Sequence, residues 1–272
     1  MRVARVLAGA AVTLAAGAAA VASAQVPAPT VGITATRTGA TLATPGPLPA
    51  GPTRMEVTRS GKGARAIDLL ALKPGATLEQ VQQKLRTKRP ESALQYANLV
   101  GGTAVGPGDK SRGFTIDLAP AVTYYVLNSS ASDSKKWTVT PLATTAQLNG
   151  AALPTADADV RFVDLDFEGD TVLPRRGVVR FENAGQAPHF AVGFPLRRNA
   201  GQRAVGRALR RNQERKLGRL LNFRGTSEPQ SLITAGAVNY SEVSFAKKGK
   251  YVLVCFYAGH HTQGMYRFVT VK

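Results

Sequence analysis

The chain has 272 residues, and its 35 Lys and Arg against 17 Asp and Glu give a formal net charge of +18 at pH 7. A charge of this size points to acidic partners and carries no information about the fold. The few aromatic residues do not alternate with basic residues as on a nucleic-acid platform, so we expect no nucleic-acid binding.

Residues 1–24 have the organisation of a secretory signal peptide. Arg2 and Arg5 precede an apolar Ala/Val/Leu/Gly segment, and Ala22 and Ala24 supply the small residues for cleavage after Ala24. This segment is too short and too rich in Ala and Gly for a good membrane anchor, and no later stretch is long and apolar enough to span a bilayer. We therefore expect a periplasmic or secreted protein.

The rest of the chain contains a weak internal repeat. An offset of 124 residues aligns 70–86 with 194–210 and keeps its register over more than sixty residues. The matched pairs include Leu72/Leu196, Ala76/Ala200, Val81/Val205, Leu85/Leu209 and Arg86/Arg210. We predict two related domains over 31–145 and 159–272, joined by a Gly/Pro/Ala-rich linker at 146–158.

Each half alternates short strands with one helical segment. In the first half, Thr77 and Gln80 form a predicted capping box. In the second half, Asn199 and Gln202 do the same ahead of a helical stripe over 200–221. Strands are predicted over 161–167, 177–183, 189–196, 240–245, 251–256 and 266–271. Many short strands with Gly and Pro between them predict an all-β fold of the sandwich type.

The segment 252–267, VLVCFYAGHHTQGMYR, holds the only Cys of the chain and two of its three His. The spacing is Cys255-x4-His260-x4-Met265, and the remaining histidine, His189, begins another predicted strand. Singly, these residues are typical of a buried thiol, exposed loop histidines and a core methionine. Together, a thiolate, two imidazoles and a thioether are the ligand set of a blue-copper site.

At these residues the second half resembles a cupredoxin of the plastocyanin, azurin and rusticyanin group. The motif N-x-G-x-x-x-H is present as Asn183 to His189, and a VLVC strand precedes the ligand loop. The resemblance implies tandem Greek-key β-sandwich domains and one type 1 copper site. In that site His189, Cys255 and His260 would be equatorial ligands and Met265 the axial ligand.

Two details of this assignment follow from the resemblance as well. His261 is an alternative to His260, because C-x5-H-x3-M also fits the loop, and we prefer His260. The side chain of Asn183 is implied to tie the two ligand loops together.

The first half repeats the pattern without the ligands. Arg65 stands at the position of His189, and Ser129 stands at that of Cys255, or Asn128 if the register moves by one. We predict a degenerate, ligand-free cupredoxin-like domain.

The resemblance implies an exported one-electron carrier with copper as its cofactor. The alternatives are an extracytoplasmic copper-handling protein and a metal-free interaction module. We expect no enzyme, because three histidines cannot build a type 1 site and a catalytic copper site together.

The basic stretch from Arg197 to Arg224 contains ten Lys or Arg and one acid, Glu214. It is either a solvated helix face or a surface that docks an acidic redox partner or an anionic membrane.

Overall fold

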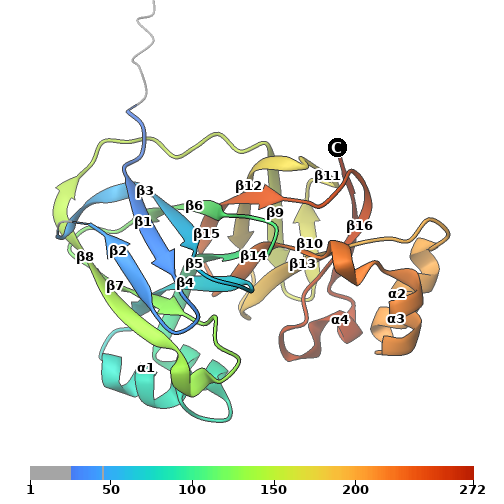
Figure 1. The fold of residues 1–272 in the computed structure, drawn as a ribbon, viewed down its shortest axis with the longest axis horizontal. Coiled ribbons are helices and arrows are strands. Elements are labelled where there is room, and N and C mark those ends of the chain that lie inside the picture. The colour runs from blue at the N-terminus through green and yellow to red at the C-terminus, as the bar shows by residue number, and fades with distance from the viewer. Residues whose placement is uncertain (1–25, 45) are drawn as a thin grey trace, which may run out of the picture.

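The computed structural model describes residues 26–44 and 46–272, and their fold is all-β, as predicted (Figure 1). The predicted signal peptide, 1–24, lies outside these residues. Within the described part of the chain, no helix is long and apolar enough to cross a membrane.

In the first half, the described residues form eight strands and one α-helix. Its strands are β1 (Thr30–Ala35), β2 (Ala40–Ala43), β3 (Leu48–Arg59), β4 (Arg65–Leu72), β5 (Ala97–Val105), β6 (Ser111–Leu118), β7 (Thr123–Asn128) and β8 (Thr138–Leu148). Helix α1 (Leu78–Leu85) is followed by a 3-10 turn at Pro90–Gln95. The predicted capping box is confirmed: the Thr77 side chain accepts from the Gln80 N–H, and the Gln80 side chain accepts from the Thr77 N–H.

The second half has a similar order of elements, with nine strands, two helices in place of α1, and a further short helix before its last strand. Its strands are β9 (Ala158–Val163), β10 (Asp166–Gly169), β11 (Val172–Leu173), β12 (Arg176–Asn183), β13 (His189–Pro195), β14 (Ser227–Ile233), β15 (Val238–Ser244), β16 (Gly249–Val254) and β17 (Tyr266–Val271). Its helices are α2 (Gln202–Arg210), α3 (Glu214–Leu220) and α4 (His260–Gln263). The helix after β4 and the helix pair after β13 are the predicted helical insertions of the two domains.

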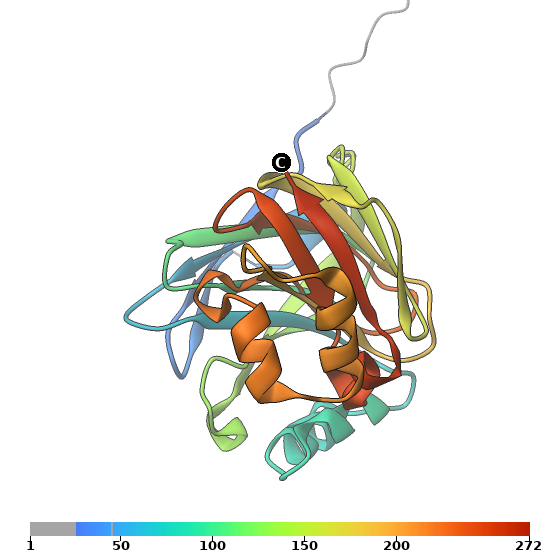
Figure 2. The same cartoon turned by 90° about the vertical axis from the view of Figure 1, so that its right-hand side faces the viewer.

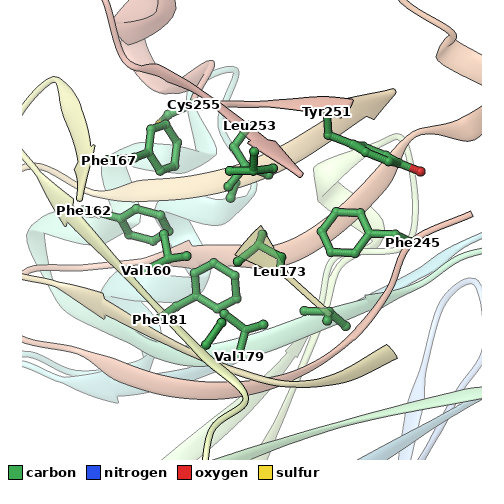
Figure 3. Packing of buried hydrophobic residues seen from close by; sticks show 14 of the residues in the cluster. Val160, Phe162, Phe167, Leu173, Val179, Phe181, Phe245, Tyr251, Leu253 and Cys255 are labelled. Atoms are coloured by element: carbon green, nitrogen blue, oxygen red, sulfur yellow. The ribbon is translucent and has the colours of Figure 1, made fainter. Parts of the chain in front are cut away.

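Two sheets enclose the core of the second half. The smaller sheet has the order β11-β17-β16-β13-β14, while β10, β9, β12 and β15 belong to the larger sheet. Aromatic residues of the larger sheet, including Phe162, Phe167 and Phe181, pack against residues of the smaller sheet such as Leu253. Figure 3 shows this core, with Cys255 among its members.

The two domains share one hydrogen-bonded sheet. Strand β15 of the second half pairs antiparallel with β6 of the first, with Tyr240 opposite Thr115 and Ser241 opposite Phe114. The first half has its own core, between strands β1, β3 and β6 on one side and β4, β5, β7 and β8 on the other. The boundaries 31–145 and 159–272 remain our proposal for dividing the chain.

The predicted strand over 161–167 is wrong as a single element. The chain turns at Asp164 and Leu165, and β9 and β10 pair antiparallel as a hairpin on either side. Leu165 has φ 68°, in the left-handed region where a strand cannot continue. The alternating pattern persists across the turn because both strands of the hairpin place alternate residues in the core.

The predicted helix over 200–221 is two helices, α2 and α3, which pack against one another (Figure 2). Asn212 separates them with φ 47°, a conformation that Asn tolerates better than most residues. The predicted Asn199/Gln202 capping box is also wrong, because α2 begins after Gly201 without a side-chain cap. The apolar residues of both helices still share one face, which covers the outer side of β16.

Candidate metal centre

The two ends of neighbouring strands bring His189 and Cys255 together. His189 is the first residue of β13, and Cys255 directly follows β16. These strands are antiparallel with Val192 opposite Val254, so the start of β13 and the end of β16 lie at the same end of the sheet. Residues 66 positions apart in the chain thus become neighbours.

Three side-chain atoms form a compact triangle there. The Sγ of Cys255 lies 3.9 Å from Nδ1 of His189 and 3.8 Å from Nδ1 of His260, and the two nitrogens are 3.2 Å apart. His189 and Cys255 are fully buried, and His260 is 7% exposed. Among the described residues, these three form the His/Cys/acid group able to hold a metal ion.

The triangle has the size of a trigonal metal site. With metal–nitrogen bonds of about 2.0 Å and a metal–sulfur bond of about 2.3 Å, as in zinc sites, trigonal geometry separates two nitrogens by about 3.5 Å. The same geometry separates sulfur from nitrogen by about 3.7 Å. The observed separations differ from these by a few tenths of an ångström, so the residues present fit a metal ion.

Asp164 orients the His189 ring, a role that the sequence did not predict. Its Oδ1 lies 3.4 Å from Nε2 of His189, which leaves Nδ1 to face Cys255. The same carboxylate accepts hydrogen bonds from the backbone N–H groups of Gln186 and Ala187. These backbone bonds, chiefly that from Ala187, hold the pKa of Asp164 below its usual value. A carboxylate behind a ligating histidine sets the ring's tautomer and orientation.

Asp164 was hidden because it lies in the turn of the β9–β10 hairpin, inside the segment predicted as one strand. The signal that could have revealed it is the polar pair Asp164 and Asp166 on either side of Leu165.

Asn183 fixes the loop that leads into β13. Its Nδ2 donates to the carbonyls of Ala187 (2.8 Å) and Ile233 (2.9 Å), and its Oδ1 accepts from the Gly185 N–H (3.0 Å). These side-chain bonds hold the 184–188 loop against the end of β14. In the described structure none of these bonds reaches the loop after Cys255. Asn183 therefore joins the 184–188 loop to β14, and not the two ligand loops to each other.

The loop after β16 closes on itself through the backbone. The Met265 N–H donates to the His260 carbonyl (3.1 Å), and the Cys255 N–H donates to the Met265 carbonyl (3.2 Å). Met265 is fully buried in the same core cluster as Cys255. The Tyr257 ring packs edge-on against His260, with ring centroids 5.5 Å apart. Backbone hydrogen bonds thus join Cys255, His260 and Met265 within one short segment.

His261 points to a different part of the molecule. Its Nε2 lies 3.3 Å from Oδ1 of Asn212, in the turn between α2 and α3, and its ring is 4.8 Å from that of Phe256. The cluster contains His260 and not His261.

Burial sets the protonation of the cluster. It lowers the pKa of His189 and His260, and it raises the pKa of the Cys255 thiol. For His189 the hydrogen bond to Asp164 acts in the opposite direction but is the smaller effect. Without a metal the cluster therefore favours two neutral rings and a thiol, and a metal ion held by these residues would displace the thiol proton.

At the matching end of the first half, the described residues form no such cluster. Arg65 begins β4 as His189 begins β13, and its guanidinium donates to the carbonyls of Ser60 and Ala64. Ser129 follows β7 as Cys255 follows β16, and its hydroxyl donates to Asp68. At the two positions that match His189 and Cys255, the side chains therefore form hydrogen bonds within the first domain.

Comparison with known proteins gives matches to solved structures alone. No family model and no curated protein match the chain. Auracyanin B is similar to 44% of this chain over 93% of its own, with 24% identity and a TM-score of 0.26. Auracyanin A, a "blue" copper protein of Chloroflexus aurantiacus, is similar to 42% of this chain over 96% of its own, with 16% identity and a TM-score of 0.27.

A third match corrects the prediction that the chain is no enzyme. The copper nitrite reductase of Nitrosomonas europaea is similar to 89% of this chain over 93% of its own, with 12% identity and a TM-score of 0.26. An enzyme therefore matches across both halves, and we withdraw the exclusion. That prediction was based on the three histidines of one chain. A symmetric oligomer can assemble a site from residues of several copies, so the number of histidines in one chain does not exclude an enzyme.

Both the fold and the cluster agree with the resemblance read from the sequence. The strands at the cluster, the sandwich around them and the residue types that converge are those the resemblance implied. The second half of the chain is a β-sandwich with the three-residue cluster at one end, and the described residues of the first half have a similar arrangement of strands without that cluster.

Proposed function

We propose that the protein is an exported type 1 copper protein that carries one electron at a time between partners. The observation that carries the proposal is the triangle of Cys255 Sγ, His189 Nδ1 and His260 Nδ1 at trigonal spacing. A thiolate with two imidazoles and a weak thioether, here Met265, is the donor set of blue-copper centres. Copper, when bound, supplies exchange between its singly and doubly charged states.

The side chains of the site are held before any metal arrives. Asp164 orients His189, and the backbone bonds between Cys255, His260 and Met265 close the other ligand loop. Ligands on two neighbouring strand ends cannot move far without breaking the sandwich core. A site of nearly constant geometry suits electron transfer, because little energy is needed to rearrange the ligands when the charge changes.

The basic helices lie next to the ligand loop and support docking of an acidic redox partner. Helix α4, which begins with His260, contacts α2, and Figure 2 shows α2 and α3 on the same side of the molecule as α4. The exposed rings of Phe223 and Phe256 both pack edge-on against Phe194. Positive charge here would attract an acidic protein, or an anionic membrane surface.

A titration of the purified chain with Cu(II), followed by absorption spectroscopy, tests the proposal. We expect an intense blue or green band at one copper per chain, and its loss in Cys255→Ser. A colourless protein that binds no stoichiometric copper would contradict the proposal and favour the metal-free interaction module.

Voltammetry then separates an electron carrier from a copper-handling protein. An electron carrier exchanges electrons quickly and reversibly and keeps its copper in the presence of a chelator. A copper-handling protein with the same ligands exchanges electrons slowly and gives its copper up.

A further inference from the structure

A cleft between the two domains is lined by four arginines. Its volume is about 520 Å³, within the range of small-molecule sites. Arg112 comes from the first domain, and Arg175, Arg176 and Arg224 come from the second.

The cleft forms where the shared sheet ends. The ladder between β6 and β15 stops at the pair Ser241 and Phe114. Next along the sheet, the Glu242 carboxylate accepts from the Gly113 N–H (2.9 Å) and from Nε of Arg54 (2.7 Å). Beyond this point the described strands of the two domains do not pair with each other, and residues of both domains line the opening.

The positive charges in the cleft exceed the negative charges. Two acids line it, and Asp109 pairs with Arg112 through a contact of 2.6 Å, while Glu228 is the other. In the described part of the chain, Arg175, Arg176 and Arg224 form no ion pair. Guanidinium groups crowded without counter-charges repel one another, and an anion between them removes this repulsion.

Two of these guanidinium groups have a buried atom without a partner. Arg112 is 8% exposed, and its other nitrogens reach Asp109 and the Glu228 carbonyl. Its Nε, like that of Arg175, is buried and accepted by no atom among the described residues. A buried donor without an acceptor costs about 1–3 kcal/mol, so such atoms are uncommon unless something outside the chain meets them.

We propose that this cleft binds a small oxyanionic molecule, one that bears carboxylate or phosphate groups, between the two domains. The planar guanidinium fork pairs with either group through two parallel hydrogen bonds. Because arginines of both domains line the cleft, one anion would contact both and strengthen their association. The first domain, which has no metal ligands, thereby contributes to a second site that is independent of the copper centre.

Isothermal titration calorimetry on the full chain tests this proposal, with inorganic phosphate and succinate as separate probes at constant ionic strength. We expect saturable binding of one probe at one site per chain, and the probe that binds more tightly identifies the phosphate or the carboxylate class. The double variant Arg176→Ala/Arg224→Ala removes two exposed side chains of the cleft. We expect it to raise the dissociation constant of that probe at least tenfold.

The control is Arg211→Ala/Arg215→Ala, which removes the same charge from exposed positions at the turn between α2 and α3. It should leave the dissociation constant unchanged within about twofold, since screened charges outside a site contribute little. The proposal is overturned if neither probe binds saturably, or if both double variants weaken binding equally.

Discussion

The Nδ1 atoms of His189 and His260 lie 3.2 Å apart, although the residues are separated by 71 positions in the chain. Two nitrogen lone pairs at this distance repel one another, so in the metal-free protein one ring must carry a hydrogen between them. Nε2 of His189 faces the Asp164 carboxylate and is therefore its protonated atom. The hydrogen between the rings then belongs to His260, and a metal ion held by both rings would displace it.

Replacing each of the adjacent histidines distinguishes their roles. His260→Ala removes one atom of the triangle, so we expect the charge-transfer band to disappear and copper affinity to fall by about 100-fold or more, beyond the effect of a group behind a ligand. His261→Ala is the matched control, because that ring contacts Asn212 and Phe256 instead. Copper titrations of both variants check this, and the opposite pattern would show that His261 is the ligand.

Asp164 can be tested with two substitutions. Asp164→Ala removes the partner of His189 Nε2 and the acceptor of the two loop N–H groups, so we expect copper affinity to fall about 10- to 100-fold. Asp164→Asn keeps an oxygen acceptor for the loop but loses the negative charge. Its copper affinity should lie between those of the wild type and Asp164→Ala. Competition with a copper chelator measures the affinities. Equal copper affinity in all three proteins would show that Asp164 does not support the site.

Met265→Leu should raise the reduction potential more than it weakens binding. A weak axial thioether stabilises the doubly charged copper state, and its replacement by a hydrocarbon of similar size keeps the core filled. We expect copper affinity to change by about tenfold or less, because the axial bond is long. Voltammetry and a chelator titration measure the two quantities. Complete loss of copper would contradict the axial assignment.

Asp68 makes stability depend on pH away from the metal site. Burial, and then the charge of Glu228, raises the pKa of Asp68 from 3.8 to about 7. Between these values the folded chain binds more protons at this position than the unfolded chain, so the group's contribution to the free energy of unfolding falls as pH rises from about 4 to about 7. Above pH 7 the penalty is constant, at no more than about 4 kcal/mol.

Asp68→Asn removes this penalty and can keep the hydrogen bond from Ser129. We expect the variant to gain stability over the wild type as pH rises from 5 to 8, measured by urea unfolding at each pH. Asp117→Asn, at an exposed position of β6, is the control. A stability difference between Asp68→Asn and the wild type that does not change with pH would refute the assignment.

The residue types of the candidate site could be predicted from the sequence, because the donor atoms are a property of each residue type. A chain with one Cys and three His that places Cys255, His260 and Met265 at even spacing restricts the candidates to a few atoms. The Thr77 capping box was equally predictable, since its contacts span only three residues. The sandwich fold followed from strand length and Gly/Pro punctuation, which are local properties too.

Other features depend on contacts between distant segments or on a single backbone angle, and the sequence could not predict them. The choice of His260 over His261 follows from how α4 turns against Asn212, and the break at Asn212 itself follows from one left-handed residue. Asp164 reaches His189 because a hairpin turn lies beside the start of β13, and the arginine cleft exists because β6 and β15 join two domains. Periodicity cannot reveal such partners, because it records which face of an element is buried and not which element lies opposite.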